Sequence, residues 1–224
     1  MIIPAGTQKY DAARHFEYEN GFFLTCPNNR IGKILAHYEL YRKILHLPGA
    51  IVECGVFKGA SLIRFSTFRD ILEAPGSRKI IGFDVFGKFP DTEKSEDQAL
   101  LNAFIKEAGI QGIASDVLQE VFSRKQISNV ELVAGDILET VPEYINNHNE
   151  LRIALLHIDT DIFEPAETAL KYLFPLVCSQ GIVLFDNYGV FPGETKAVDA
   201  FLAKNPVNLR KLSLAHAPVY LVKE

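Results

Sequence analysis

The sequence predicts an α/β protein built on a mostly parallel, doubly wound β-sheet. Strand-like apolar runs and helix-like amphipathic stretches alternate along most of the 224 residues. In one stretch, IVECGVFKG at 51–59, an apolar run ends in an acid and two glycines follow four positions apart. At the C-terminus, two strand-like runs have no helix between them. We therefore expect seven strands, the last two forming an antiparallel edge hairpin.

Composition indicates an ordinary globular chain of one domain. The hydrophobic share is 48% and the charged share 23%, and the net charge of −5 is spread without long runs. This balance predicts neither a nucleic-acid partner nor an anionic membrane surface. We read no signal peptide in MIIPAGTQKY and no apolar run near the ~20 residues of a membrane span. Three cysteines without metal spacing favour reduced thiols, so we expect a cytoplasmic protein.

The N-terminal part is expected to differ from the rest. Residues 1–30 read as an irregular, mixed segment that forms an arm or a flap over a site, and the sequence leaves both open. Residues 31–224 are expected to form a single domain. Apolar residues at helical spacing predict a helix over 30–47, which ends at a Pro-Gly pair. A buried strand at 50–54 and a helix at 59–72 follow.

The remaining elements continue the alternation. Strands are expected at 79–85, 130–134, 153–158, 181–185, 210–214 and 219–222. Helices are expected at 96–107, at 115–124, from near 139, at 165–176 and at 195–203. The segment 87–128 is long for a simple connection, which predicts an insertion or lid that covers a site.

The turn after the first strand lies where doubly wound sheets bind ligands. Its spacing, Glu53-x-Gly55-x-x-x-Gly59, is neither that of dinucleotide folds nor that of a P-loop. The carboxylate of Glu53 would repel a phosphate but could pair with a cationic ligand. This favours an aminoacyl-nucleoside such as S-adenosylmethionine, with a merely structural turn as the alternative.

Two further acids follow neighbouring strands. Asp84 is well placed to accept hydrogen bonds from ribose hydroxyls, or else it is a turn or cap residue. Asp136 could recognise an adenine amino group, and equally could cap the helix that begins near Glu139. An acid on each of the first strands fits the class I methyltransferase sheet better than a dehydrogenase sheet.

A polar cluster is predicted after the fourth and fifth strands. Its members are Asp159, Asp161, Asp186 and Asn187. These oxygen ligands would suit Mg²⁺ or another hard divalent cation, which could lower the pKa of an attacking hydroxyl. The alternative is that the acids cap the following helices. His157 shares a strand face with Asp159 and is either a base or a satisfied core histidine.

Ordered motifs carry a family resemblance. They are VECGVFKGAS, FDVFGKFP, GDILETVP, LLHIDTDIFEPAETAL and GIVLFDNYGVFPGETKAVDAFL. From about residue 20 onward the chain resembles the macrocin O-methyltransferase family, whose members methylate sugar hydroxyls of antibiotics and related glycosides. The resemblance implies a Rossmann-like class I methyltransferase fold, S-adenosylmethionine as methyl donor and Mg²⁺. It also implies a sugar-containing small-molecule acceptor and a homo-oligomer.

The resemblance also assigns roles by position. It places the donor site at Glu53, Gly55, Gly59, Ser61, Asp84 and Asp136. Asp159 matches the first metal-binding aspartate, which is also the proposed general base in the family. Asp186 and Asn187 match the paired aspartates that complete the metal site. Asn187 can still ligate a hard cation, but one negative charge is lost. Asp-Thr-Asp also replaces the usual Asp-Gly-Asp.

The sequence thus predicts Mg²⁺-assisted O-methylation of a sugar hydroxyl in a glycoside, natural product or nucleotide sugar. Asp159, or less favourably His157, would take the hydroxyl proton. Three alternatives stay open: a metal-dependent methyltransferase of catechols or small phenols, an NAD-dependent oxidoreductase, and a non-catalytic nucleoside-binding module. The sequence does not name the acceptor.

Overall fold

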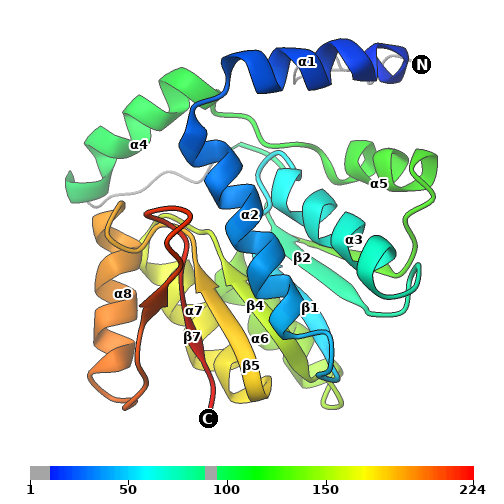
Figure 1. Cartoon of the computed structure of the whole chain (residues 1–224). Helices are drawn as coiled ribbons and strands as arrows, with labels where there is room; N and C mark the ends of the chain where they lie inside the picture. The colour runs from blue at the N-terminus through cyan, green and yellow to red at the C-terminus, as the bar shows by residue number, and fades with distance from the viewer. Residues whose placement is uncertain (1–10, 89–94) are drawn as a thin grey trace.

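A seven-stranded sheet forms the centre of the protein (Figure 1). The computed structural model describes residues 11–88 and 95–224. The strand order is β3-β2-β1-β4-β5-β7-β6. The parallel strands are β1 (Ala50–Cys54), β2 (Ile80–Asp84), β3 (Val130–Ala134), β4 (Ile153–Ile158) and β5 (Val177–Phe185). β7 (Val219–Val222) runs antiparallel to both β5 and β6 (Arg210–Lys211). The doubly wound sheet with its antiparallel edge hairpin is confirmed.

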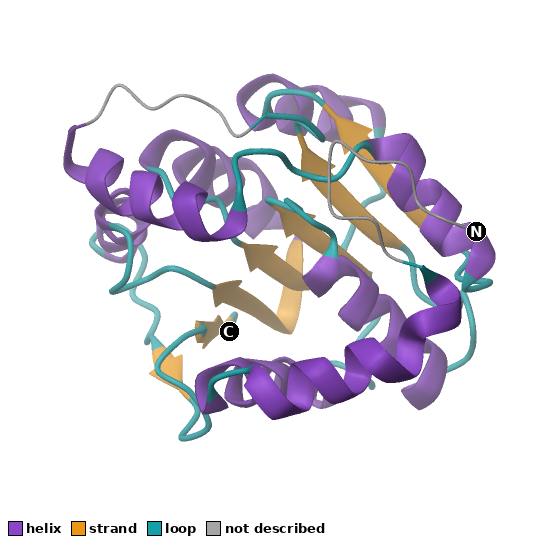
Figure 2. Ribbon diagram, turned by 90° about the horizontal axis from the view of Figure 1, so that it is seen from above, coloured by secondary structure: helices purple, strands orange, loops and turns teal. Residues whose placement is uncertain are grey.

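Helices cover both faces of the sheet, and the strands form a row between them when seen from above (Figure 2). One face packs against α2 (Asn28–Lys43), α3 (Ala60–Leu72) and α5 (Ser115–Arg124). The other packs against α6 (Ile137–Asn147), α7 (Phe163–Leu173) and α8 (Pro192–Leu202). Within β1, Ile51 belongs to the first core and Val52 to the second, as the two-residue period of a strand requires.

The N-terminal region is helical where the sequence predicts irregular structure. The short 3-10 helix η1 (Ala12–Arg14) leads into α1 (His15–Thr25), while residues 1–10 lie outside the described residues. α1 lies beyond the carboxyl ends of the parallel strands (Figure 1), and in this described stretch it buries none of its side chains. Apolar residues occur on all its sides rather than in one stripe, so periodicity gave no helix signal. Within the described ranges, neither α1 nor any other helix is long and apolar enough to be a membrane span.

Smaller differences concern where elements begin and end. α2 covers 28–43 instead of 30–47, β5 begins at Val177 instead of Gly181, and β6 has two residues instead of five. α7 begins two residues before Pro165 and continues as a short 3-10 helix, η2 (Phe174–Leu176). The prediction took Pro165 as the first helical residue, but proline is tolerated throughout the first helical turn.

The segment after β2 covers the turn that follows β1. It contains α4 (Ser95–Ala108) and α5, close to the predicted helices. The backbone N–H of Ile113 donates to the carbonyl of Phe57 at 2.7 Å. The rings of Phe57 and Phe104 in α4 lie 5.4 Å apart between centroids. The insertion is therefore fastened to this turn, and its action as a lid remains a prediction.

Candidate active site

The turns after β1 and β4 meet where the strand order reverses, between neighbouring strands of the sheet. Doubly wound sheets bind ligands outside the strand ends at such a point. Gly55 has a φ of +88°, and a Cβ placed on it would lie 1.9 Å from the carbonyl oxygen of Asp159. The backbone N–H of Asp159 donates to the carbonyl of Cys54 at 2.9 Å. Glycine is therefore required at position 55 to bring the two turns together.

Asp84 holds the turn after β1 in place. Its carboxylate accepts backbone N–H groups from Val56 at 2.7 Å and Phe57 at 2.9 Å through Oδ2. It also accepts from Phe86 at 2.7 Å through Oδ1. This is the turn role that the sequence left open. A contact between Asp84 and a ribose stays a prediction.

Two other residues of the predicted donor site also have structural partners. Gly59, with φ of +79°, precedes α3, and a Cβ there would lie 2.9 Å from Cδ1 of Leu118. α5 therefore fills the space beside Gly59. Asp136 caps α6 by accepting the backbone N–H of Leu138 at 2.9 Å, which confirms the capping alternative. Recognition of adenine by Asp136 stays a prediction.

Glu53 and Ser61 lie inside the protein. The Glu53 side chain is 0% exposed, and its Oε1 accepts from the Ser61 hydroxyl and lies 3.2 Å from Nδ1 of His157. Among the described residues, Oε2 of Glu53 has no hydrogen-bond partner. The carboxylate expected at the donor thus belongs to a buried network, and its contact with the donor stays a prediction.

His157 connects this network to Asp186. Glu53 and His157 are paired positions on β1 and β4, and Asp186 directly follows β5. Nε2 of His157 lies 3.5 Å from Oδ1 of Asp186. Burial lowers the pKa of His157, but hydrogen bonding and charge from Asp186 and Glu53 outweigh it and raise the pKa to about 10. Burial raises the pKa of Asp186, yet Lys33 and His157 hold it well below its usual value. Both shifts favour the charged forms of His157 and Asp186.

α2 contributes two residues that sequence reasoning missed. Lys33 and His37 share one helix face at i, i+4 spacing. The Lys33 ammonium contacts Oδ2 of Asp186 and lies 4.0 Å from Oδ2 of Asp159. Nε2 of His37 lies 3.7 Å from Oδ1 of Asp186. Burial lowers the pKa of His37 to about 3, so its ring is neutral. The i, i+4 spacing could have indicated that Lys33 and His37 lie on one face of the helix. The apolar pattern of this stretch, however, predicted only that the helix packs on the sheet.

Asp159 is the accessible carboxylate of the predicted cluster. Its side chain is 25% exposed, against 4% for Asp186. Oδ1 of Asp159 accepts a hydrogen bond from Nδ2 of Asn187 at 2.8 Å. Burial and the negative charge of Asp186 raise the pKa of Asp159 to about 7. A carboxylate with this pKa can accept a proton near neutral pH.

Glu194 of α8, also missed, fixes the turns after β4 and β5. Its Oε2 accepts backbone N–H groups from Thr160 at 3.2 Å and Asp161 at 3.3 Å. Its Oε1 accepts the N–H of Asn187 at 2.9 Å. Burial raises the pKa of Glu194 to about 8. An acid in the first turn of a helix is common, so the sequence offered no sign of this role.

The predicted ligand set does not fit a divalent cation as its side chains stand. The Lys33 ammonium faces the carboxylates of both Asp159 and Asp186. Asn187 turns its amide nitrogen, a donor, toward Asp159. In the described ranges, one group of His, Cys, Asp or Glu brings three potential ligand atoms within 4.8 Å: His37, His157 and Asp186, all buried. Lys33 already contacts Asp186, and burial keeps the His37 ring neutral, so we read this group as an ion pair of His157 and Asp186 with a neutral histidine beside it.

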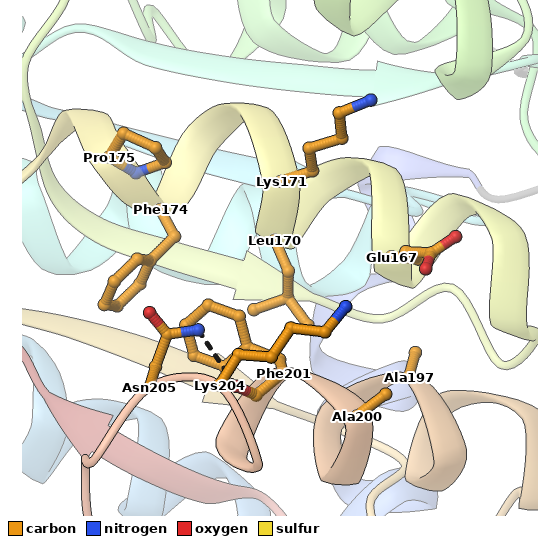
Figure 3. A pocket seen from close by; sticks show the side chains of 10 residues that line it. All are labelled: Glu167, Leu170, Lys171, Phe174, Pro175, Ala197, Ala200, Phe201, Lys204 and Asn205. Carbon is orange, nitrogen blue, oxygen red and sulfur yellow. Dashed lines mark hydrogen bonds between the residues drawn. The ribbon is translucent and has the colours of Figure 1, made fainter.

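A separate pocket of about 390 Å³ lies between α7 and α8 (Figure 3). Leu170, Phe174 and Phe201 line it together with charged residues such as Glu167 and Lys204. Its lining includes none of the predicted site residues. This pocket is therefore distinct from the polar cluster at the ends of β4 and β5.

Comparison with known proteins matches residues 36–221 to the Macrocin-O-methyltransferase (TylF) family. The 8-demethyl-8-(2,3-dimethoxy-alpha-L-rhamnosyl)-tetracenomycin-C 4'-O-methyltransferase of Streptomyces olivaceus is 27% identical over 151 residues, 64% of this chain and 54% of that protein. The demethyldecarbamoylnovobiocin O-methyltransferase of Streptomyces niveus is 25% identical over 182 residues, 78% of this chain and 66% of that protein. The matched part of the chain thus spans just over half to about two thirds of these curated relatives.

Solved structures of CalS11 resemble most of the chain. One, described as a calicheamicin methyltransferase, has a TM-score of 0.76 and 29% identity, and the match covers 95% of this chain and 86% of CalS11. Another, an apo structure described as a TDP-rhamnose 3'-O-methyltransferase, has a TM-score of 0.68 and 30% identity over 95% of this chain and 87% of CalS11. The fold is that of class I methyltransferases.

Proposed function

The chain belongs to the Macrocin-O-methyltransferase (TylF) family, and from that premise we propose that it methylates a sugar hydroxyl with S-adenosylmethionine as donor. The names of two relatives point to a deoxysugar: one acts on a rhamnosyl tetracenomycin and the other is a TDP-rhamnose methyltransferase. We propose as acceptor a sugar of a natural product or of a nucleotide sugar. A cytoplasmic location and a homo-oligomeric state stay predictions.

The observation that carries the proposal is the contact between the turns of Gly55 and Asp159. It sets the backbone of Asp159, whose carboxylate is partly exposed, against the turn where the donor is expected. In the reaction, the acceptor oxygen forms a bond to the methyl carbon while the carbon–sulfur bond breaks, leaving S-adenosylhomocysteine. Asp159 takes the hydroxyl proton, and most of the rate comes from this proton transfer and from proximity.

His157 is the weaker candidate for the base. Its ring is 0% exposed and is held between Glu53 and Asp186. With a pKa raised to about 10 it already carries a proton at neutral pH and cannot accept another. We therefore assign His157 a positioning role: its imidazolium holds the carboxylate of Asp186 in place.

Mg²⁺, which the sequence predicts, has no step in this proposal. The oxygen atoms expected to bind it already face an ammonium and an amide N–H₂ group. The residues that act in the proposal are Asp159 as base, the turn at Gly55 as part of the donor site, and the groups that orient them.

Titration with S-adenosylhomocysteine tests the donor site. We expect a micromolar Kd by calorimetry, unchanged by a chelator, because the turn after β1 does not depend on a divalent cation. NAD serves as the comparison ligand, and tight NAD binding would instead favour the oxidoreductase alternative. If S-adenosylhomocysteine does not bind with or without chelator, the proposal is wrong.

Methylation assays with TDP-rhamnose and with catechol then separate sugar acceptors from phenol acceptors. Binding of S-adenosylhomocysteine without methyl transfer to any acceptor would favour the nucleoside-binding module.

The pH dependence of methyl transfer tests the base. The ionised form of Asp159 is the active one, so its raised pKa predicts that kcat/KM falls below about pH 7, roughly tenfold per pH unit. Asp186 raises this pKa and Lys33 opposes the rise, so both shape the same profile. The Kd of S-adenosylhomocysteine, measured over the same range, controls for loss of the donor site. A kcat/KM that stays constant from pH 8 to pH 5 would contradict the assignment.

A further inference from the structure

We propose that the ammonium group of Lys33 is the resident cation of the acceptor site and stands in place of a divalent metal ion. This inference rests on the proposed function, because it takes Asp159 and its neighbours to be the acceptor site. Its own evidence is the arrangement of Lys33, Asp159, Asp186 and Asn187.

The first step is the position of the charge. The Lys33 ammonium contacts one oxygen of Asp186 and lies 4.0 Å from an oxygen of Asp159. The Asp186 side chain is almost completely buried, so the attraction is little screened by water. A divalent cation binding the same two oxygens would meet a positive charge already there. It could bind only after Lys33 moved away or lost its proton.

The second step is that the backbone of Lys33 is held in place by the packing of its helix. His37 and Leu40, further along α2, are fully buried against the sheet. At the residue before Lys33, a Cβ on Gly32 would lie 2.2 Å from the carbonyl oxygen of Leu214. The start of α2 is thus packed against the C-terminal segment, backbone to backbone. A shift of the helix large enough to withdraw Lys33 would break this contact.

The third step is the third expected ligand. Asn187 donates to Asp159 at 2.8 Å, and its own backbone N–H is tied to Glu194 at 2.9 Å. One carboxylate is therefore replaced by a group that satisfies Asp159 as a hydrogen-bond donor. Lys33 and Asn187 therefore place one positive charge and one hydrogen-bond donor against the oxygens that a metal ion would need. With asparagine at position 187, two carboxylates remain, and the positive charge of Lys33 offsets one of their two negative charges.

The chemical consequence concerns the acceptor oxygen. An ammonium has three N–H donors, and Lys33 directs one of them at Asp186. A remaining donor is available to hydrogen-bond the acceptor hydroxyl and to stabilise the negative charge that develops on it as Asp159 takes the proton. Fixed positive charge from Lys33 then does what a metal would otherwise do.

Titration with Mn²⁺, followed by electron paramagnetic resonance, tests the inference without any assay of activity. We expect the unmodified protein to bind Mn²⁺ no tighter than about 1 mM, the weak end for oxygen-ligand sites. The double variant Lys33→Ala/Asn187→Asp, which removes the ammonium and restores the acid, is expected to bind at least about tenfold tighter. Asn187→Asp alone should still bind weakly, since Lys33 remains.

Lys43→Ala is the matched control, because Lys43 is an exposed lysine of the same helix. It should leave Mn²⁺ binding as in the unmodified protein. The inference is overturned if the unmodified protein or Asn187→Asp binds Mn²⁺ at about 0.1 mM or tighter. It is equally overturned if the double variant melts cooperatively yet gains no Mn²⁺ binding. Should the double variant not fold, the first two titrations still decide. S-adenosylhomocysteine binding is measured separately, so a failure of the donor site is distinguishable from a failure of this inference.

Discussion

Asp159→Asn is expected to lower kcat by about 10²- to 10⁴-fold, the range that a positioned general base contributes. Asparagine keeps the size of the side chain and an oxygen that can accept the hydrogen bond from Asn187, which lies at 2.8 Å in the native protein. It removes the group that accepts the proton. The Kd of S-adenosylhomocysteine should change by less than about twofold, since the donor turn touches the Asp159 backbone and not its side chain.

Asp116→Asn is the matched control for this substitution. Asp116 is an exposed acid in the first turn of α5, and asparagine keeps the size of its side chain while removing the charge. Its kcat should stay close to that of the native protein. Near-native kcat in Asp159→Asn would remove Asp159 from the role of base.

Much of the fold was predictable because its signals are local. β1, β3, β4, β7 and α5 have the bounds that the apolar pattern predicts. In the central strands β1 and β4 every residue is buried, which gives an unbroken apolar run with a polar residue only near the end. The N-terminal helix α1 was missed because it buries none of its side chains in the described part of the chain, so no stripe of apolar residues marks it.

The candidate site was predictable only in part because its contacts are long-range. The sequence places Asp159, Asp186 and Asn187 together, and strand topology explains why. It cannot show that Lys33, 153 positions before Asp186, reaches the same point, since that depends on how α2 crosses the sheet. Nor can it show that Glu53 and His157 turn into the face under α2 and α3 and bind each other there. A cluster of acids in a sequence therefore suggests a metal site, because the basic residues that pair with the acids in the fold cannot be located from the sequence.

Gly55→Ala is expected to destabilise the protein by about 3 kcal/mol and to weaken S-adenosylhomocysteine binding at least about tenfold. A side chain in the left-handed region costs about 1–2 kcal/mol by itself. The rest comes from the added Cβ, which would lie 1.9 Å from the carbonyl oxygen of Asp159 and must push the two turns apart. The same displacement moves the donor turn away from the carboxylate, so both the melting temperature and the Kd should change.

Gly21→Ala controls for the chemistry of the substitution. Gly21 lies within α1, where a Cβ would meet nothing within 4 Å. Alanine there should leave S-adenosylhomocysteine binding unchanged and leave the melting temperature equal or slightly higher, because alanine favours a helix by up to about 1 kcal/mol over glycine. If Gly55→Ala behaved like Gly21→Ala in both measurements, the contact between the turns of β1 and β4 would not be what holds the donor beside the base. If Gly55→Ala loses both stability and affinity while Gly21→Ala loses neither, stability and binding depend on the same backbone contact, and the fold's switch point is also the reaction site.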